Sequence, residues 1–167
     1  MRARGGATVE DLRRVPGKAE LVDGEIFASL REYARRTGRG YAIGDNIGFV
    51  VNLPNRQSFC PDAAFYVGPL PADFIKGAPV FAVEIRSKSD YGPVAEARMA
   101  AKRADYFAAG TLVVWDVDIE REGWVRVYRA ADSLNPSESR RSAMADAEPA
   151  LHDWSMAVDD LFPPALI

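Results

Sequence analysis

The sequence has only one cysteine and one histidine, and both shortages exclude kinds of site. Cys60 cannot form an internal disulfide or a multi-cysteine zinc site, and a lone thiol fits a reducing compartment. We expect it to be a small buried side chain. A single histidine, His152, argues against a histidine metal cluster and against a Ser-His-Asp triad. We expect His152 at the surface of the tail.

The chain also lacks long apolar runs and an excess of positive charge. Its apolar runs are far shorter than a membrane span, and its first residues lack the apolar stretch of a secretory signal. We therefore expect a cytoplasmic protein with no membrane association. A net charge of -3 and a pI near 5.3 argue against the broad nucleic-acid footprint of a basic domain. A local basic cleft remains compatible with them.

What the chain does contain is typical of one globular domain. With 167 residues, 48% of them hydrophobic and 10% aromatic, it is long enough for one core, and we predict a single domain over 1–167. The three tryptophans are predicted to be core or interface residues rather than platforms for base stacking. They are Trp115, Trp124 and Trp154.

The first third of the chain predicts helices. A short helix is expected over 8–14, then an extended segment with an Asp-Gly turn over 20–26, then a second helix over 26–37 that ends at Gly38. Three arginines lie off the apolar positions of the second helix. We interpret them as a solvated face in preference to a phosphate-binding patch: Arg31, Arg35 and Arg36.

The pattern then changes to strands. Strands are predicted within 41–67 and over 80–85, and a helix begins at Pro93. Apolar residues of that helix at heptad-like spacing predict its sheet-facing stripe: Val94, Ala97, Ala101, Ala104 and Ala108.

The last third predicts a hairpin followed by a polar segment. Strands are expected over 112–117 and 124–128, a looped or less ordered segment over 131–147, and a packed terminal segment over 154–162. Because a strand, a crossover helix and a strand form a parallel unit while a hairpin is antiparallel, the sheet should be mixed. The expected fold class is α/β, with a mixed central sheet flanked by helices.

One carboxylate interrupts the most apolar strand of the chain. Glu84 stands among Phe, Val and Ile residues, where a charge costs several kcal/mol unless it is hydrated, paired or bound to a metal. Asp62, at the start of an earlier strand, could join it to hold Mg²⁺ or Mn²⁺ through oxygen ligands. Lys102 on the following helix could then orient water or stabilise developing charge. The alternative is that Glu84 is a satisfied core carboxylate.

Five segments in order resemble a known family. They are Glu20-Leu-Val-Asp-Gly-Glu25, Pro61-Asp-Ala-Ala-Phe65, Val83-Glu-Ile-Arg-Ser-Lys-Ser-Asp90, Lys102-x-x-x-Tyr106-x-x-x-Gly110 and Val114-Trp-Asp-Val-Asp118. Together they resemble the Uma-type restriction endonuclease family of the PD-(D/E)XK nuclease superfamily. Each segment is weakly specific, but their order is fairly specific.

The resemblance implies a restriction-endonuclease-like fold and metal-dependent hydrolysis of phosphodiester bonds in DNA. It assigns catalytic roles to Asp62, Glu84 and Lys102, with Mg²⁺ or Mn²⁺ held by Asp62, Glu84 and the carbonyl of Ile85. Supporting roles are implied for three more residues: Glu20 beside the metal, Arg86 where the superfamily motif has lysine, and Lys88, which could substitute for Lys102. Ser87 and Asp90 match a family turn and are expected to cap the next helix.

Two departures from the family pattern matter for function. The stretch that usually separates the Asp-Gly-Glu segment from the second helix is nearly absent, which indicates a trimmed N-terminal region. The family turn also commonly has proline where this chain has Lys88.

Two hypotheses from different classes follow. The first is a magnesium-dependent endonuclease that acts on nucleic acid, for which we expect DNA and a homodimer. The second is a non-catalytic binding or assembly module that retains the fold. The acidic pI favours the second, and the survival of Asp62, Glu84 and Lys102 favours the first.

Overall fold

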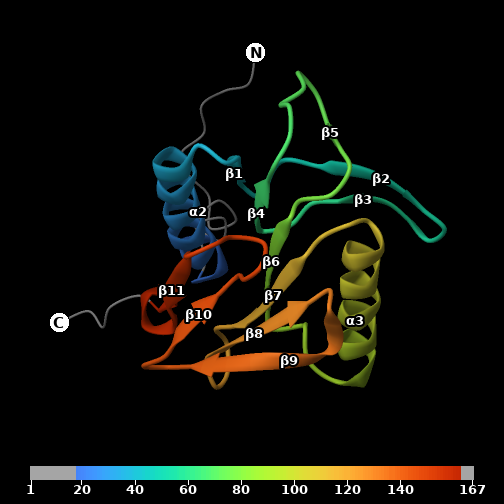
Figure 1. The fold of residues 1–167 in the computed structure, drawn as a ribbon. Helices are drawn as coiled ribbons and strands as arrows, with labels where there is room; N and C mark the ends of the chain where they lie inside the picture. The colour runs from blue at the N-terminus through green and yellow to red at the C-terminus, as the bar shows by residue number, and fades with distance from the viewer. Residues whose placement is uncertain (1–17, 163–167) are drawn as a thin grey trace, which may run out of the picture.

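The computed structural model describes residues 18–162, and its centre is a six-stranded sheet in the order β1-β4-β6-β7-β8-β9 (Figure 1). The helix expected over 8–14 lies outside the described residues. A three-stranded sheet, β3-β2-β5, and a two-stranded sheet, β10-β11, adjoin the central sheet. The elements are α2 (Lys18–Thr37), β1 (Tyr41–Ile43), β2 (Phe49–Leu53), β3 (Arg56–Phe59), β4 (Ala63–Tyr66), β5 (Ile75–Lys76), β6 (Phe81–Ile85), α3 (Pro93–Ala108), β7 (Val113–Asp118), β8 (Trp124–Arg129), β9 (Asp132–Arg140), β10 (Met144–Asp146), β11 (Ser155–Ala157) and the 3-10 helix η1 (Val158–Leu161).

The central sheet is mixed, as the sequence predicts. Strands β6 and β7 pair in parallel, and α3 connects them. The pairs β1-β4, β4-β6, β7-β8 and β8-β9 are antiparallel. The expected α/β class, with a mixed sheet flanked by helices, is confirmed.

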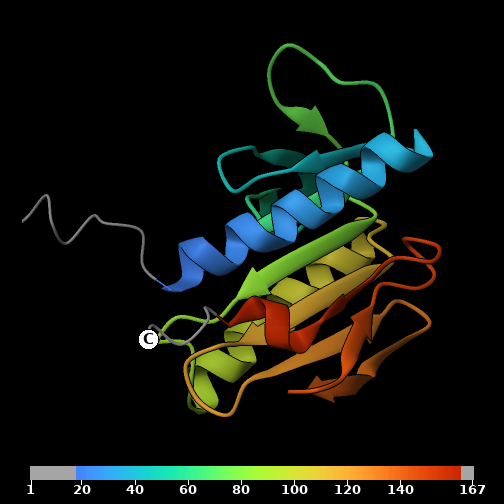
Figure 2. The ribbon, with the colours of Figure 1, turned by 90° about the vertical axis from the view of Figure 1, so that its left-hand side faces the viewer.

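Each face of the sheet has its own apolar core. On the α2 side, the rings of Phe81, Trp115 and Trp154 pack with centroids 5.1 to 5.5 Å apart. On the α3 side, Tyr106 stacks on Phe59, with centroids 4.0 Å apart and an interplanar angle of 13°. Figure 2 shows α2 crossing its face of the sheet, with its first turns near the end of β6. The two helices therefore cover opposite faces of β6. All three tryptophans are buried, as predicted.

Helix α2 begins earlier than predicted. Residues 20–26 form its first turns, so the prediction of an extended segment with an Asp-Gly turn was wrong. Val22 and Ile26 continue the buried stripe of Leu30 and Tyr33 at helical spacing. Burial of that stripe outweighs the cost of Gly24 inside a helix, which is about 1 kcal/mol. The helix ends as expected at Gly38, whose φ is +64°.

Helix α3 begins at Pro93, as predicted, but a different stripe faces the sheet. Val94 is 82% exposed, and the four alanines of the predicted stripe are exposed too. The inward positions are instead Ala95, Met99, Lys102 and Tyr106, at spacings of three and four residues. The four alanines of the predicted stripe face solvent, and Lys102 faces the sheet.

The segment 131–147 is not the loop that its polarity predicts. It contains β9 and β10, and β9 pairs with β8 over most of its length. Most of its side chains are polar and exposed and none is buried, which fits its place as the edge strand of the central sheet. The terminal segment packs as expected, since Trp154, Val158 and Leu161 are buried. No helix within 18–162 is long and apolar enough to cross a membrane.

Candidate active site

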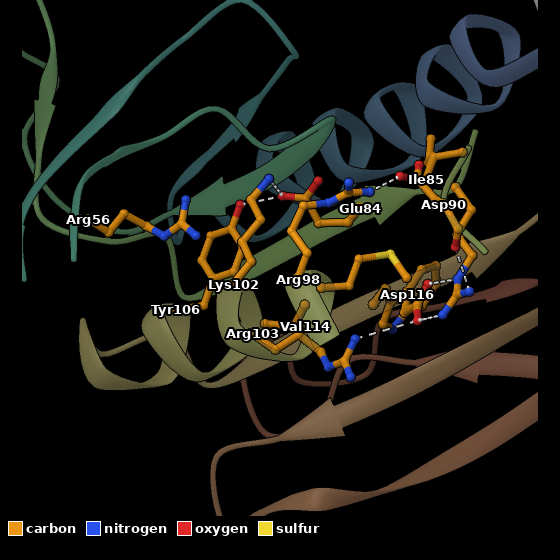
Figure 3. Close-up of a pocket in the computed structure, with 13 residues that line it drawn as sticks. Arg56, Glu84, Ile85, Asp90, Arg98, Lys102, Arg103, Tyr106, Val114 and Asp116 are labelled. Atoms are coloured by element: carbon orange, nitrogen blue, oxygen red, sulfur yellow. Dashed lines mark hydrogen bonds and ion pairs between the residues drawn. The ribbon is translucent and has the colours of Figure 1, made fainter. Parts of the chain in front are cut away.

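The carboxylate of Glu84 meets a lysine and a tyrosine from α3 at the carboxyl end of β6 (Figure 3). Lys102 Nζ lies 2.6 Å from Glu84 Oε1, and the Tyr106 hydroxyl donates a hydrogen bond of 2.6 Å to the same oxygen. The Glu84 and Lys102 side chains are 26% and 28% exposed, so this ion pair is screened by solvent only in part. The predicted pairing of the strand acid with the helix lysine is therefore present.

Asp62 immediately precedes β4, the strand that pairs with β6, and so lies beside Glu84. Its backbone N–H donates to the Val83 carbonyl over 3.0 Å, and its Oδ2 accepts a hydrogen bond of 2.7 Å from the Ile85 N–H. The pKa of Asp62 is raised to about 6, mainly by burial and also by the charge of Glu84, against the lowering effects of the Ile85 N–H and Lys102. The Asp62 carboxylate is therefore poorly solvated, and Lys102 compensates its charge only in part.

Two further acids extend this centre, and sequence reasoning missed both. Asp23 comes from α2 and Asp45 from the turn after β1, and the two carboxylates lie close enough to interact electrostatically. Burial, Asp45 and Asp62 raise the pKa of Asp23 to about 7, and Glu20 contributes less. Asp23 belongs to the Glu20-Leu-Val-Asp-Gly-Glu25 segment, which is its sequence signal, but no sequence pattern marks Asp45. Glu20 is exposed in the first turn of α2, at the outer margin of this acidic group.

Arg86 has a structural position. It is 2% exposed, forms two hydrogen bonds with the Asp116 carboxylate and pairs with Glu96 of α3. These ion pairs raise the pKa of its guanidinium above the ordinary value, against the effect of burial. Asp116 of β7 and Glu96 of α3 compensate its charge. Arg86 thereby links α3, the helix that carries Lys102, to the sheet.

The turn after β6 differs from the sequence expectation. Lys88 is exposed, outside the pocket that Glu84 and Lys102 line. Ser87 and Asp90 bond to each other, over 2.8 Å from the Ser87 N–H to Asp90 Oδ2, and do not cap α3. The residue before α3 is Gly92, which forms no side-chain cap.

Cys60 is exposed, so the prediction of a buried thiol was wrong. Its Sγ donates a hydrogen bond of 2.8 Å to the Asp45 carbonyl, just before β4 begins. The strand-entry segment that positions Asp62 is therefore too close to the surface to bury the thiol.

Among the residues that the structure describes, two groups could hold a metal ion. Contacts with other described residues use Oδ2 of Asp62 and Oε1 of Glu84, and so leave Oδ1 and Oε2 for a cation. Carboxylate oxygens suit Mg²⁺ or Mn²⁺, and a cation would offset both the burial of the Asp62 charge and its repulsion by Glu84. Asp62 and Glu84 therefore fit a site for Mg²⁺ or Mn²⁺.

The second group lies elsewhere, at the surface. Glu148, His152 and Asp153 each offer one ligand atom within 4.8 Å of the others. His152 is 66% exposed, which agrees with its predicted surface position, and both of its ring nitrogens face carboxylates. Arg36 and Arg39 line the same depression as His152 and Asp153, and their positive charges oppose cation binding there.

A pocket of about 270 Å³ opens between β6, β7 and α3 beside Glu84. Polar side chains of both signs line it, among them Arg98, Arg103 and Asp116 (Figure 3). The site thus combines a carboxylate pair, a lysine and a solvent-accessible approach.

A family model described as "Uma2: Putative restriction endonuclease" matches residues 8–159, which is most of the chain. The chain belongs to the Uma2 family. The resemblance found in the sequence is confirmed, and Uma2 membership supports nuclease activity in general. No curated protein matches the chain.

A solved structure supports the Uma2 fold. The chain is similar to a crystal structure described as a putative nuclease belonging to DUF820 from Anabaena variabilis ATCC 29413, with a TM-score of 0.71 and 18% sequence identity. The similarity covers 89% of this chain and 82% of the other. At this identity the match shows the fold, and the restriction-endonuclease-like fold class is confirmed.

Proposed function

We propose that this Uma2 chain is a metal-dependent endonuclease that hydrolyses phosphodiester bonds in DNA, with Mg²⁺ or Mn²⁺ as its cofactor. The observation that carries the proposal is the distance of 2.6 Å between Lys102 Nζ and Glu84 Oε1. The Asp62 carboxylate lies next to this pair and accepts a hydrogen bond from Ile85 at the end of β6. A lysine that only stabilised the helix would gain most by facing solvent.

Each residue has a role that follows from its position. Asp62 and Glu84 would hold the cation with one oxygen each, and the carbonyl of Ile85 would be a further ligand. When bound, the cation supplies Lewis-acid activation of the phosphate and a more acidic water. Lys102 holds its ammonium where it can orient the attacking water or offset charge on the phosphate. Tyr106 fixes the Glu84 carboxylate through its hydroxyl.

The non-catalytic module remains the second candidate. It would keep the fold for binding or assembly, and it predicts no divalent-ion binding. The favourable donor set at Asp62 and Glu84 argues for the nuclease, because carboxylates left next to each other without a cation cost stability.

Plasmid nicking with Mg²⁺ or Mn²⁺ tests the proposal. We expect Glu84→Gln and Lys102→Ala each to lower the rate by ~10²-fold or more, the usual effect of removing one transition-state contact. Lys88→Ala is the matched lysine variant and should nick nearly as fast as the wild type, since Lys88 is exposed in the turn. Nicking that survives both site substitutions would contradict the proposal, as would calorimetry that shows no divalent-ion binding.

A further inference from the structure

We propose that a groove between α2 and β1 binds the sugar-phosphate backbone of the nucleic-acid substrate. The groove has a volume of about 630 Å³. Its lining includes three arginines, Arg31, Arg35 and Arg39, and two aromatic residues, Phe27 and Tyr41. The inference rests on the nuclease proposal for the identity of the ligand.

The charge of this groove is opposite to that of the whole chain. The net charge is -3, yet no carboxylate of the described residues lines the groove. Within 18–162, none of the three groove arginines forms an ion pair. The arginines that do form ion pairs lie elsewhere, such as Arg56, Arg86 and Arg129. The groove is thus a local basic surface, and clustered arginines favour phosphate oxygens through paired hydrogen bonds.

Helix α2 contributes residues both to the groove and to the acidic centre. Asp23, Phe27, Arg31 and Arg35 are spaced four residues apart on α2, so they form one stripe along the helix. That stripe runs beside β1: a Cβ on Gly44 would lie 3.9 Å from the Phe27 ring. Asp45 follows Gly44, and its charge acts on Asp23. The row from Asp23 to Arg35 winds slowly around α2, by about 40° at each step of four residues, and so leads from the acids to the arginines.

The distances along the stripe suit a strand of nucleic acid. At a rise of about 1.5 Å per residue, Arg31 and Arg35 lie about 12 and 18 Å beyond Asp23 along the helix. With about 3.4 Å between successive nucleotides of a helical strand, those distances correspond to roughly three to five nucleotides. A substrate with its reacting phosphate at Glu84 would place later phosphates over the groove.

Helix stabilisation does not explain this cluster fully. Arg35 and Arg36 lie in the last turn of α2, where positive charge interacts favourably with the helix dipole. Arg31 lies earlier, and Arg39 follows the helix end. Tyr41 remains 45% exposed at the rim, where a ring can stack on an unpaired base.

Binding measured in EDTA tests the inference without requiring hydrolysis. Anisotropy of fluorescein-labelled 20-nucleotide DNA, single-stranded and duplex, would be followed from 50 to 200 mM salt. The groove variant carries Arg31→Gln, Arg35→Gln and Arg39→Gln. The matched control loses the same charge elsewhere through Arg121→Gln, Arg140→Gln and Arg141→Gln, three exposed arginines.

The expected result is a selective loss in the groove variant. Its affinity should fall ~10- to 100-fold near 0.1 M salt, and the slope of log K against log salt should become shallower by about 2 to 3. The control should lose no more than about threefold, the part due to net charge. Equal losses in the two variants, or no DNA binding by the wild type, would overturn the inference. Should the triple variant not fold, Arg31→Gln alone should still weaken binding severalfold.

The two proposals fail in different ways. A wild type that binds DNA through the groove but never nicks it with a divalent ion would refute the nuclease and leave the groove standing. A groove variant that nicks limiting plasmid as fast as the wild type would refute the groove and leave the nuclease standing.

Discussion

Replacing Asp62 with Asn should stabilise the metal-free protein at high pH. Asn keeps an oxygen that can accept the Ile85 N–H, and it removes a charge that burial and Glu84 disfavour. The pKa of Asp62 rises from 3.8 to about 6 in the folded protein. At about 1.4 kcal/mol per pKa unit this amounts to ~3 kcal/mol, and partial exposure reduces it to ~2 kcal/mol.

The size of this gain depends on pH. Between pH 3.8 and 6 the folded state binds more protons at Asp62 than the unfolded state, so the wild type loses stability as pH rises. Above pH 6 the cost is complete. The variant cannot ionise at this position, so its gain should be near zero at pH 4 and ~2 kcal/mol at pH 8, or ~6 °C in Tm for a chain of this size.

Urea and thermal unfolding in EDTA at pH 4 and pH 8 would measure the difference. Asp73→Asn removes the same charge from an exposed aspartate and should leave the unfolding free energy within about 0.5 kcal/mol at both pH values. Added Mn²⁺ should stabilise the wild type more than Asp62→Asn, because it binds the folded state through that carboxylate. A variant that is less stable at pH 8, or a gain independent of pH, would refute the reasoning.

Two other predictions concern the scaffold. Asp116→Ala should lower the unfolding free energy, measured in urea, by about 3 to 5 kcal/mol, because it leaves the buried Arg86 without one of its carboxylates. Glu138→Gln, the control at a partly exposed ion pair, should change the unfolding free energy by less than about 1 kcal/mol. Equal effects would show that Asp116 does not compensate Arg86. Gly24→Ala should raise the unfolding free energy by about 0.5 to 1 kcal/mol, since Gly24 lies inside α2 and a Cβ there meets no atom within 4 Å; a loss would mean that 23–24 forms a turn instead.

Much of the fold could be predicted because its strands have strong local patterns. The apolar run at Phe81–Ile85, the Pro93 helix start and the hairpin strands are set by residues close in sequence. The errors occurred where burial opposed a local pattern. Gly24 indicated a turn, yet Val22 and Ile26 are buried only if the chain there is helical. The alanines of α3 indicated a packed stripe, yet Tyr106 is the larger buried residue and sets which side faces inward.

The candidate site was predictable in part. Asp62, Glu84 and Lys102 were identified from a charge in an apolar strand and from resemblance, and the structure brings Glu84 and Lys102 together. Their chemical roles stay a proposal. Asp45 was not predictable, because its nearness to Asp23 and Asp62 depends on how β1, β4 and α2 meet.

The sequence by itself therefore determined the class of the fold, the family and the acids at the strand ends, since these depend on local pattern and on motif order. Only the tertiary structure decided which charges are compensated. Arg86, which stands where the superfamily motif has lysine, is paired with Asp116 and Glu96, while Lys102 on the inward face of α3 contacts Glu84. Charges separated by tens of residues interact only after folding has brought them within a few ångströms in a partly desolvated site, where Coulomb interactions are strong.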